Sequence, residues 1–191
     1  SNRRRSLSAL VALLTVSTLV ACGGGGDSAG AITGGGGGGT AILAGDFAAS
    51  NPSPGANTVS MIGTANSNIV TVTVAVTGTS DIYGASFDVI YDPTMAQFAN
   101  WSPGSVLEDN NQGVAYQVNA QQPGRVIVGV SRVASGSGAN VGVTRGLMTL
   151  SFTVISSGTS TIAFDKESLL RGQPPQPIGG IAFDGGTLIA N

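Results

Sequence analysis

The sequence predicts an all-β protein whose globular part is a single antiparallel β-sandwich, jelly-roll-like and built from about nine strands. Three observations support this prediction. The 191 residues include 30 glycines but only 9% charged residues, a composition that suits short strands joined by turns. From residue 58 onward, apolar and polar residues alternate at a period of two. Turn-forming residues separate these alternating segments at short intervals.

The clearest alternating segment runs from residue 69 to 76, where every second residue is valine. This period places the valines on one face of a strand. A domain of this length buries roughly two-thirds of its unfolded surface, which is enough for one core without a cross-link. The aromatic residues expected in that core are Phe87, Tyr91, Phe98, Phe152, Phe164 and Phe183. The expected strands are residues 58–62, 69–77, 82–91, 96–102, 114–119, 125–132, 147–155, 159–165 and 181–190.

Residues 1–22 have the features of a bacterial lipoprotein signal peptide. Arginines at residues 3–5 precede an apolar stretch, residues 7–20, which is too short to cross a bilayer comfortably as a helix. Leu-Val-Ala followed by Cys22 resembles a lipobox, so we expect Cys22 to carry lipid and anchor the chain in the cell envelope. Gly23 stands where an inner-membrane retention signal would place Asp, which favours the outer membrane in a Gram-negative cell. A buried free thiol is the plainer alternative.

Residues 23–57 are expected to form a flexible tether that joins the lipid anchor to a sandwich at residues 58–191. The tether contains two glycine runs, residues 23–26 and 34–39, and buries too little apolar area to offset the entropy of ordering it. A flexible coil of this length spans about 30 to 35 Å root-mean-square. Residues 40–47 are apolar enough to add an edge strand, but Gly45 and Asp46 favour an early break there.

Composition excludes several functions. The chain has no histidine, which removes Ser-His and Cys-His nucleophile pairs and the commonest zinc ligand. Cys22 is the only cysteine, so no internal disulfide forms. Apart from the arginines at residues 3–5, five basic residues face ten acidic ones, so nucleic acid is not an expected partner. We expect neither a cofactor nor a metal site.

Carboxylates offer only weak candidates for chemistry. Residues 108–113 form an oxygen-rich segment, but its spacing misses the EF-hand pattern, and a solvated hairpin loop is the favoured interpretation. An enzyme would require two carboxylates within about 5 to 10 Å in one cleft, and flat sheet faces rarely provide one. The protein is therefore expected not to be an enzyme. The carboxylates available for such a pair are Asp88, Glu108, Asp109, Asp165 and Glu167.

One expected strand ends in Tyr-Asp-Pro at residues 91–93 and is the most informative stretch of the chain. Its alternation puts Phe87 on the buried side and Gly84 and Ser86 on the other, and proline then ends the strand. Together with a later Gly-Leu strand at residues 146–154 and a Phe-Asp-Gly-Gly ending at residues 181–189, it resembles the cohesin domain. Cohesins are the receptor modules that hold dockerin-bearing enzymes in cellulosomes. The resemblance covers residues 58–191.

The resemblance implies a module that binds a dockerin-like protein through a flat sheet face, with any calcium belonging to the dockerin. By matched position, the contact residues would be Gly84, Ser86, Val130 and Arg132. The family often has Asn or Asp at the first two positions, from which Gly84 and Ser86 depart. The alternative is a carbohydrate-binding module of the same architecture, in which Trp101 would stack on a polysaccharide. A partly buried edge residue is the favoured interpretation of Trp101, because such modules usually present several aromatic rings.

Overall fold

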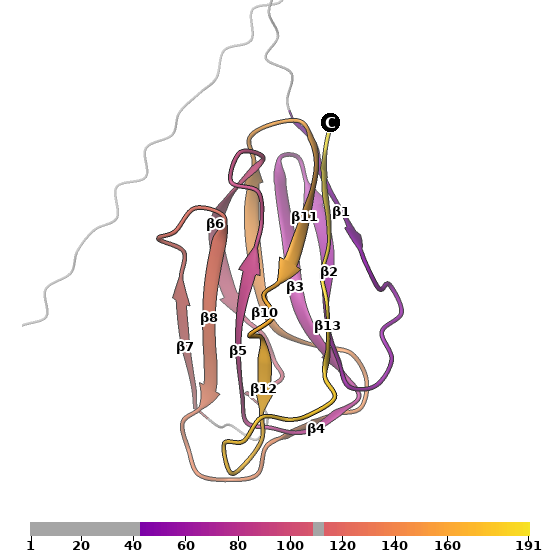
Figure 1. The fold of residues 1–191 in the computed structure, drawn as a ribbon. Helices are drawn as coiled ribbons and strands as arrows, with labels where there is room; N and C mark the ends of the chain where they lie inside the picture. The colour runs from indigo at the N-terminus through magenta and orange to yellow at the C-terminus, as the bar shows by residue number, and fades with distance from the viewer. Residues whose placement is uncertain (1–42, 109–112) are drawn as a thin grey trace, which may run out of the picture. The chain divides into compact units, whose positions relative to one another are not determined.

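The computed structural model describes residues 43–108 and 113–191, and every regular element there is a β-strand (Figure 1). The predicted all-β sandwich is confirmed. Within these residues, no helix is long and apolar enough to cross a bilayer. The smaller sheet contains, in spatial order, β13 (Ala182–Asp184), β2 (Thr58–Asn66), β3 (Ile69–Thr77), β10 (Arg145–Val154) and β6 (Ala96–Pro103).

The larger sheet forms the second layer. One further pair, β4 (Thr79–Ile82) with β9 (Ala139–Val141), stands apart from both sheets. Pairing is antiparallel except between β13 and β2, which run parallel. The larger sheet contains, in spatial order, β1 (Gly45–Ala49), β14 (Gly186–Ala190), β11 (Gly158–Phe164), β5 (Gly84–Ile90), β8 (Arg125–Arg132) and β7 (Val114–Asn119), and β12 (Leu169–Arg171) also pairs with β5.

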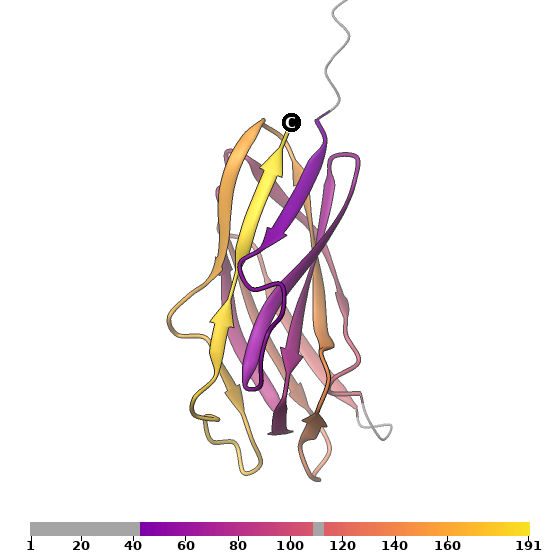
Figure 2. The ribbon, with the colours of Figure 1, turned by 90° about the vertical axis from the view of Figure 1, so that its right-hand side faces the viewer.

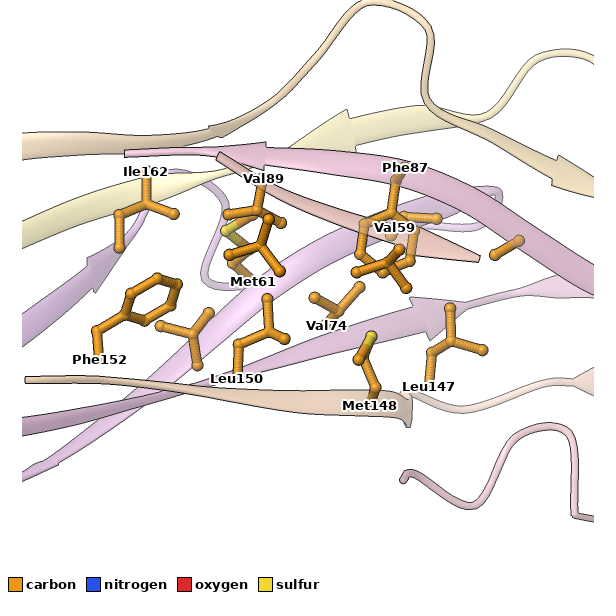
Figure 3. Close-up of a cluster of buried hydrophobic side chains, with 14 of the residues drawn as sticks. Val59, Met61, Val74, Phe87, Val89, Leu147, Met148, Leu150, Phe152 and Ile162 are labelled. Carbon is orange, nitrogen blue, oxygen red and sulfur yellow. The ribbon is translucent and has the colours of Figure 1, made fainter. Parts of the chain in front are cut away.

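The core lies between the two sheets and is filled by the inward residues of each alternating strand. Figure 3 shows Phe87 and Val89 of β5 facing Leu150 and Phe152 of β10. The ring of Phe152 is fully buried and meets the ring of Tyr91 edge-on at 5.1 Å between centroids, a favourable arrangement for aromatic pairs. All six aromatic residues expected in the core are buried or partly buried against it.

Strand β1 corrects the predicted tether, because residues 45–49 belong to the larger sheet rather than to a linker. Figure 2 shows β1, in indigo, beside β14, in yellow, and the register pairs Gly45 with Ala190. Phe47 explains why the chain docks here. Its side chain is only 9% exposed and lies where a Cβ atom at Gly63 or Gly186 would overlap the ring. Residues 23–42 of the expected tether and Cys22 lie outside the described residues.

The last expected strand, residues 181–190, is two strands in different sheets. β13 pairs with β2 of the smaller sheet, and β14 pairs with β11 of the larger sheet. The chain crosses between the layers at Gly185, where a side chain would overlap the backbone of Ile162. By contrast, β3, β7 and β8 begin and end at the residues expected from alternation alone.

Candidate partner-binding face

The side of β12, β5, β8 and β7 that points away from the core is called the outer face below. On β5, Ser86 is exposed, whereas its neighbours Ala85 and Phe87 are buried, so the strand alternates as the sequence predicts. The strand register aligns the outer residues in rows across the sheet. The first row is Arg171, Gly84, Ser131 and Ala115, the second is Leu169, Ser86, Gly129 and Gln117, and the third is Asp88, Ile127 and Asn119.

The structure corrects two of the four predicted contact residues. Val130 is 3% exposed and Arg132 is 5% exposed, and both side chains point inward. The alternation of β8 explains the correction, because the buried residues Val126, Val128 and Val130 share one phase of the strand. The residues of β8 on the outer face are therefore Gly129 and Ser131 rather than Val130 and Arg132. The outward position of Ser86 is as predicted.

Buried Arg132 has a structural role. Its Nε donates a hydrogen bond to the carbonyl oxygen of Leu107 at 3.0 Å, and a second guanidinium nitrogen donates to the carbonyl oxygen of Ser137 at 2.6 Å. The third guanidinium nitrogen is buried and has no partner in the described part of the chain. Arg132 thus ties the segment before residue 109 to the loop that follows β8.

Two adjoining hollows lie on the outer face. The larger has a volume of about 710 Å³ and spans β5, β8 and β7 over the first two rows, and the smaller, about 370 Å³, continues toward Ile127. They share Gly129 and Gln117 in their walls. The hollows exist because small residues occupy consecutive positions on neighbouring strands. The small residues are Gly84, Ser86, Ala115, Gly129 and Ser131.

Arg171 and Pro175 form one wall of the larger hollow. Arg171 is exposed, and within residues 43–108 and 113–191 its guanidinium makes no ion pair. Asp81 holds the loop that carries Pro175. One carboxylate oxygen of Asp81 accepts a hydrogen bond from the backbone N–H of Gln173 at 3.1 Å, and the other accepts from Gly138 at 3.0 Å. The wall is therefore fixed to the neighbouring loop rather than free in solvent.

An ion pair lies beside the hollows on the same face. Arg125 Nε donates to a carboxylate oxygen of Asp88 at 2.7 Å, and Arg125 is 3.8 Å from Asp165. The hydrogen bond that Arg125 donates to Asp88, and then the charge of Asp88, raise the pKa of Arg125 above its usual value. The two carboxylates are thus brought together by an arginine, and neither lines a hollow. This is a surface ion pair rather than an acid and base facing each other across a cleft.

Trp101 lies elsewhere, on β6 at the edge of the smaller sheet. It sits opposite buried Leu150, and its ring centroid is 5.3 Å from that of Tyr116 on β7. This matches the expected partly buried edge residue. Burial, and then the charge of Glu108, raise the pKa of Tyr116 above its usual value. Carbohydrate binding through Trp101 stays a prediction, and no other exposed ring is stacked with it among the described residues.

No group of three or more Cys, Asp or Glu side chains among the described residues is placed to hold a metal ion. The expected oxygen-rich loop at residues 109–112 lies outside these residues. Of the carboxylates considered for a catalytic pair, Asp109 is therefore not placed.

Comparison with known proteins identifies the family of this sandwich. The family model for the cohesin domain matches residues 58–174. The chain belongs to the cohesin domain family. The predicted resemblance is confirmed, although the family match begins after β1. No curated protein was found to match the chain.

Solved cohesins share the fold at low sequence identity. The type II cohesin–X–dockerin complex of Acetivibrio cellulolyticus is 16% identical, with a TM-score of 0.55 over 72% of this chain and 95% of that chain. The second type II cohesin of the adaptor scaffoldin from the same organism is 18% identical, with a TM-score of 0.54 over 76% and 88%. CaCohA2 from Clostridium acetobutylicum is 18% identical, with a TM-score of 0.51 over 62% and 79%.

Proposed function

We propose that this chain is a non-catalytic receptor module that captures a dockerin-like protein through the outer face of β12, β5, β8 and β7. The observation that supports this most is the pair of hollows on that face, in a member of the cohesin domain family. One similar solved structure is a cohesin in complex with an X–dockerin pair. Affinity would come from a standard-size buried patch with a few apolar anchors and a polar rim.

Filling the hollow tests this proposal. A Cβ atom at Gly129 would meet only the Gln117 Cβ, at 3.9 Å, so the fold accommodates a side chain that projects into the hollow. Gly129→Leu should weaken binding of a dockerin module by at least about 2 kcal/mol, roughly 30-fold, as expected for a central contact. Gly142→Leu is the matched control, because no atom lies within 4 Å of its Cβ position and it lies away from the outer face.

The measurement is titration calorimetry of the full chain against a panel of purified calcium-loaded dockerin modules. Binding that is lost in Gly129→Leu and kept in Gly142→Leu supports the outer face as the interface. Equal binding by both variants would place the interface elsewhere. If no dockerin binds the unmodified chain, the proposed function is wrong.

We further propose that lipid on Cys22 anchors the module to the cell envelope, with the domain facing the cell surface or periplasm, and in the outer membrane if the host is Gram-negative. The lipobox-like residues 19–22 support this proposal. Cells fed a labelled fatty acid should incorporate the label into the wild-type chain and not into Cys22→Ser. Membrane fractionation should show the same difference, and a labelled Cys22→Ser chain would contradict the anchor.

A further inference from the structure

We infer that the partner of the outer face presents one bulky apolar side chain to the larger hollow and a carboxylate to Arg171. This inference rests on the proposed function and specifies the chemistry of the dockerin-like partner. It combines two observations, the size of the hollow and the charge that Arg171 places in its wall.

The size of the hollow favours a large apolar anchor. Its volume of about 710 Å³ lies in the range of sites that bury most of a small ligand. Ala115 and Pro175 line it beside Gly84 and Gly129, and its lining is largely apolar. A Leu, Met or Phe side chain from a partner would occupy more of this space than Ser or Ala, make more dispersion contacts with the lining and release more water from apolar surface.

The charge in the wall favours an acidic neighbour. Among the residues that the structure describes, Arg171 is the only charged one that lines either hollow. The other arginine on this face, Arg125, is already paired with Asp88, whereas Arg171 makes no ion pair with any described residue. A guanidinium binds a carboxylate with two parallel hydrogen bonds. A neutral partner that covered Arg171 would remove the water that solvates the guanidinium and supply no acceptor in its place, which is unfavourable.

The strand order gives the spacing between the two groups. Arg171 on β12 and Ser131 on β8 both pair with Gly84 on β5, so two strand spacings separate them. Neighbouring strands lie about 4.8 Å apart. The carboxylate and the apolar anchor of the partner should therefore lie roughly 5 to 10 Å apart, since the Arg171 side chain can reach toward the hollow. On a helix, this distance corresponds to residues about one to two turns apart.

A displayed library of dockerin modules with randomised surface positions tests the inference. Selection on the full chain should enrich modules that combine Leu, Met or Phe with a nearby Asp or Glu. Selection on Arg171→Glu should replace the acid by Lys or Arg. Binding of the first set should fall roughly tenfold or more in Arg171→Glu and recover when the charge of the partner is also reversed. Lys166→Glu is the matched charge control, because exposed Lys166 does not line a hollow.

The outcomes separate the inference from the proposed function. Enriched dockerins that carry Ser, Thr or Ala at their contact positions, or that bind Arg171→Glu as tightly as the wild type, would overturn the inference and leave dockerin capture intact. Enrichment of no dockerin would overturn both. Circular dichroism and thermal melting of each variant establish that it is folded. Arg171 is a suitable site for this test because its side chain makes no hydrogen bond or ion pair within the described residues.

Discussion

The outer surfaces of the two sheets differ in the residues that cover them. On the smaller sheet, the outward positions of β3 and β10 include Thr71, Thr73, Thr149 and Thr153. These β-branched side chains cover the strands, and the hydroxyl oxygens of Thr73 and Thr149 are 3.4 Å apart. On the larger sheet, the outward positions in the first two rows of β5 and β8 are Gly84, Ser86, Gly129 and Ser131, and the larger hollow lies there.

The difference indicates that the residues of the outer face stabilise their strands less than the threonines of the smaller sheet do. Threonine suits a pleated, half-exposed surface, whereas glycine in a strand loses entropy on folding and has no side chain to pack. The core does not require Gly129 to be small, because space is open above it. The threonine-covered face shows what the same fold carries without such gaps. The fold therefore does not explain the gap at Gly129, whereas Gly84 must be small because a Cβ atom there would lie 2.7 Å from the carbonyl oxygen of Val130.

The largest expected effect concerns a side chain that both sheets share. Phe47 covers Gly63 of the smaller sheet and Gly186 of the larger sheet. Phe47→Ala should lower the free energy of unfolding by about 3 kcal/mol or more, as for other buried aromatic residues, and both faces should lose order together. Urea denaturation measures the change, with Phe47→Leu as a milder control. An unchanged unfolding midpoint in Phe47→Ala would mean that β1 is not needed by either sheet.

A smaller effect is expected on the threonine-covered face. Thr73→Gly should lower the free energy of unfolding by about 1 kcal/mol, because it removes a β-branched residue from a central strand. Dockerin affinity should not change, since Thr73 lies on the opposite sheet. Denaturation and calorimetry on the same sample test both statements. A loss of affinity at unchanged stability would reverse the roles assigned to the two faces.

Replacing a glycine of the outer face by threonine should stabilise the fold, whereas the reverse change on the smaller sheet should destabilise it. Gly129→Thr should raise the free energy of unfolding by about 0.5 to 1 kcal/mol and weaken dockerin binding. A gain in stability together with a loss of binding would show that the hollow serves the partner. If Gly129→Thr instead lowers the unfolding midpoint, glycine is there for the fold and the comparison of the two faces fails.

The smallest effect is expected at the edge where β6 and β7 bring the two sheets together. The pKa of Tyr116 is raised by burial, so its hydroxyl holds its proton to higher pH in the folded state than in the unfolded chain. Its contribution is therefore complete below about pH 10 and is lost as the pH rises through the folded pKa. Tyr116→Phe should flatten the fall in the urea midpoint between pH 9 and 11. A slope equal to that of the wild type would show that Tyr116 is not its source.

Local patterns were sufficient to predict much of the fold. The alternating valines of β3 and β8 fixed the bounds of both strands, and the Tyr-Asp-Pro ending of the strand at β5 led to the right family. The phase of β8 was also present in the sequence, because Val126, Val128 and Val130 alternate on one face. Matched position alone suggested Val130 and Arg132 instead, and this proved misleading.

Other features depend on contacts between distant residues. Arg132 shares the inward phase of β8, but its guanidinium can be buried only because the carbonyl oxygens of Leu107 and Ser137 accept its hydrogen bonds, and neither contact leaves a pattern in the sequence. β1 is similar, because its pairing with β14 and the place of Phe47 over Gly63 join residues far apart in sequence. The walls of the hollow, Arg171 and Pro175, reach the outer face only through the pairing of β12 with β5.

Strand β1 also determines how this module can be handled in isolation. A fragment that starts at Thr58, where the family match begins, would lack the strand that covers β14. The bare backbone of β14 would then be a template for pairing with another copy, the usual route to aggregation and strand exchange at open sheet edges. A fragment that starts at residue 43 keeps the hydrogen bonds between Ala44 and Asn191, and β14 stays paired with β1.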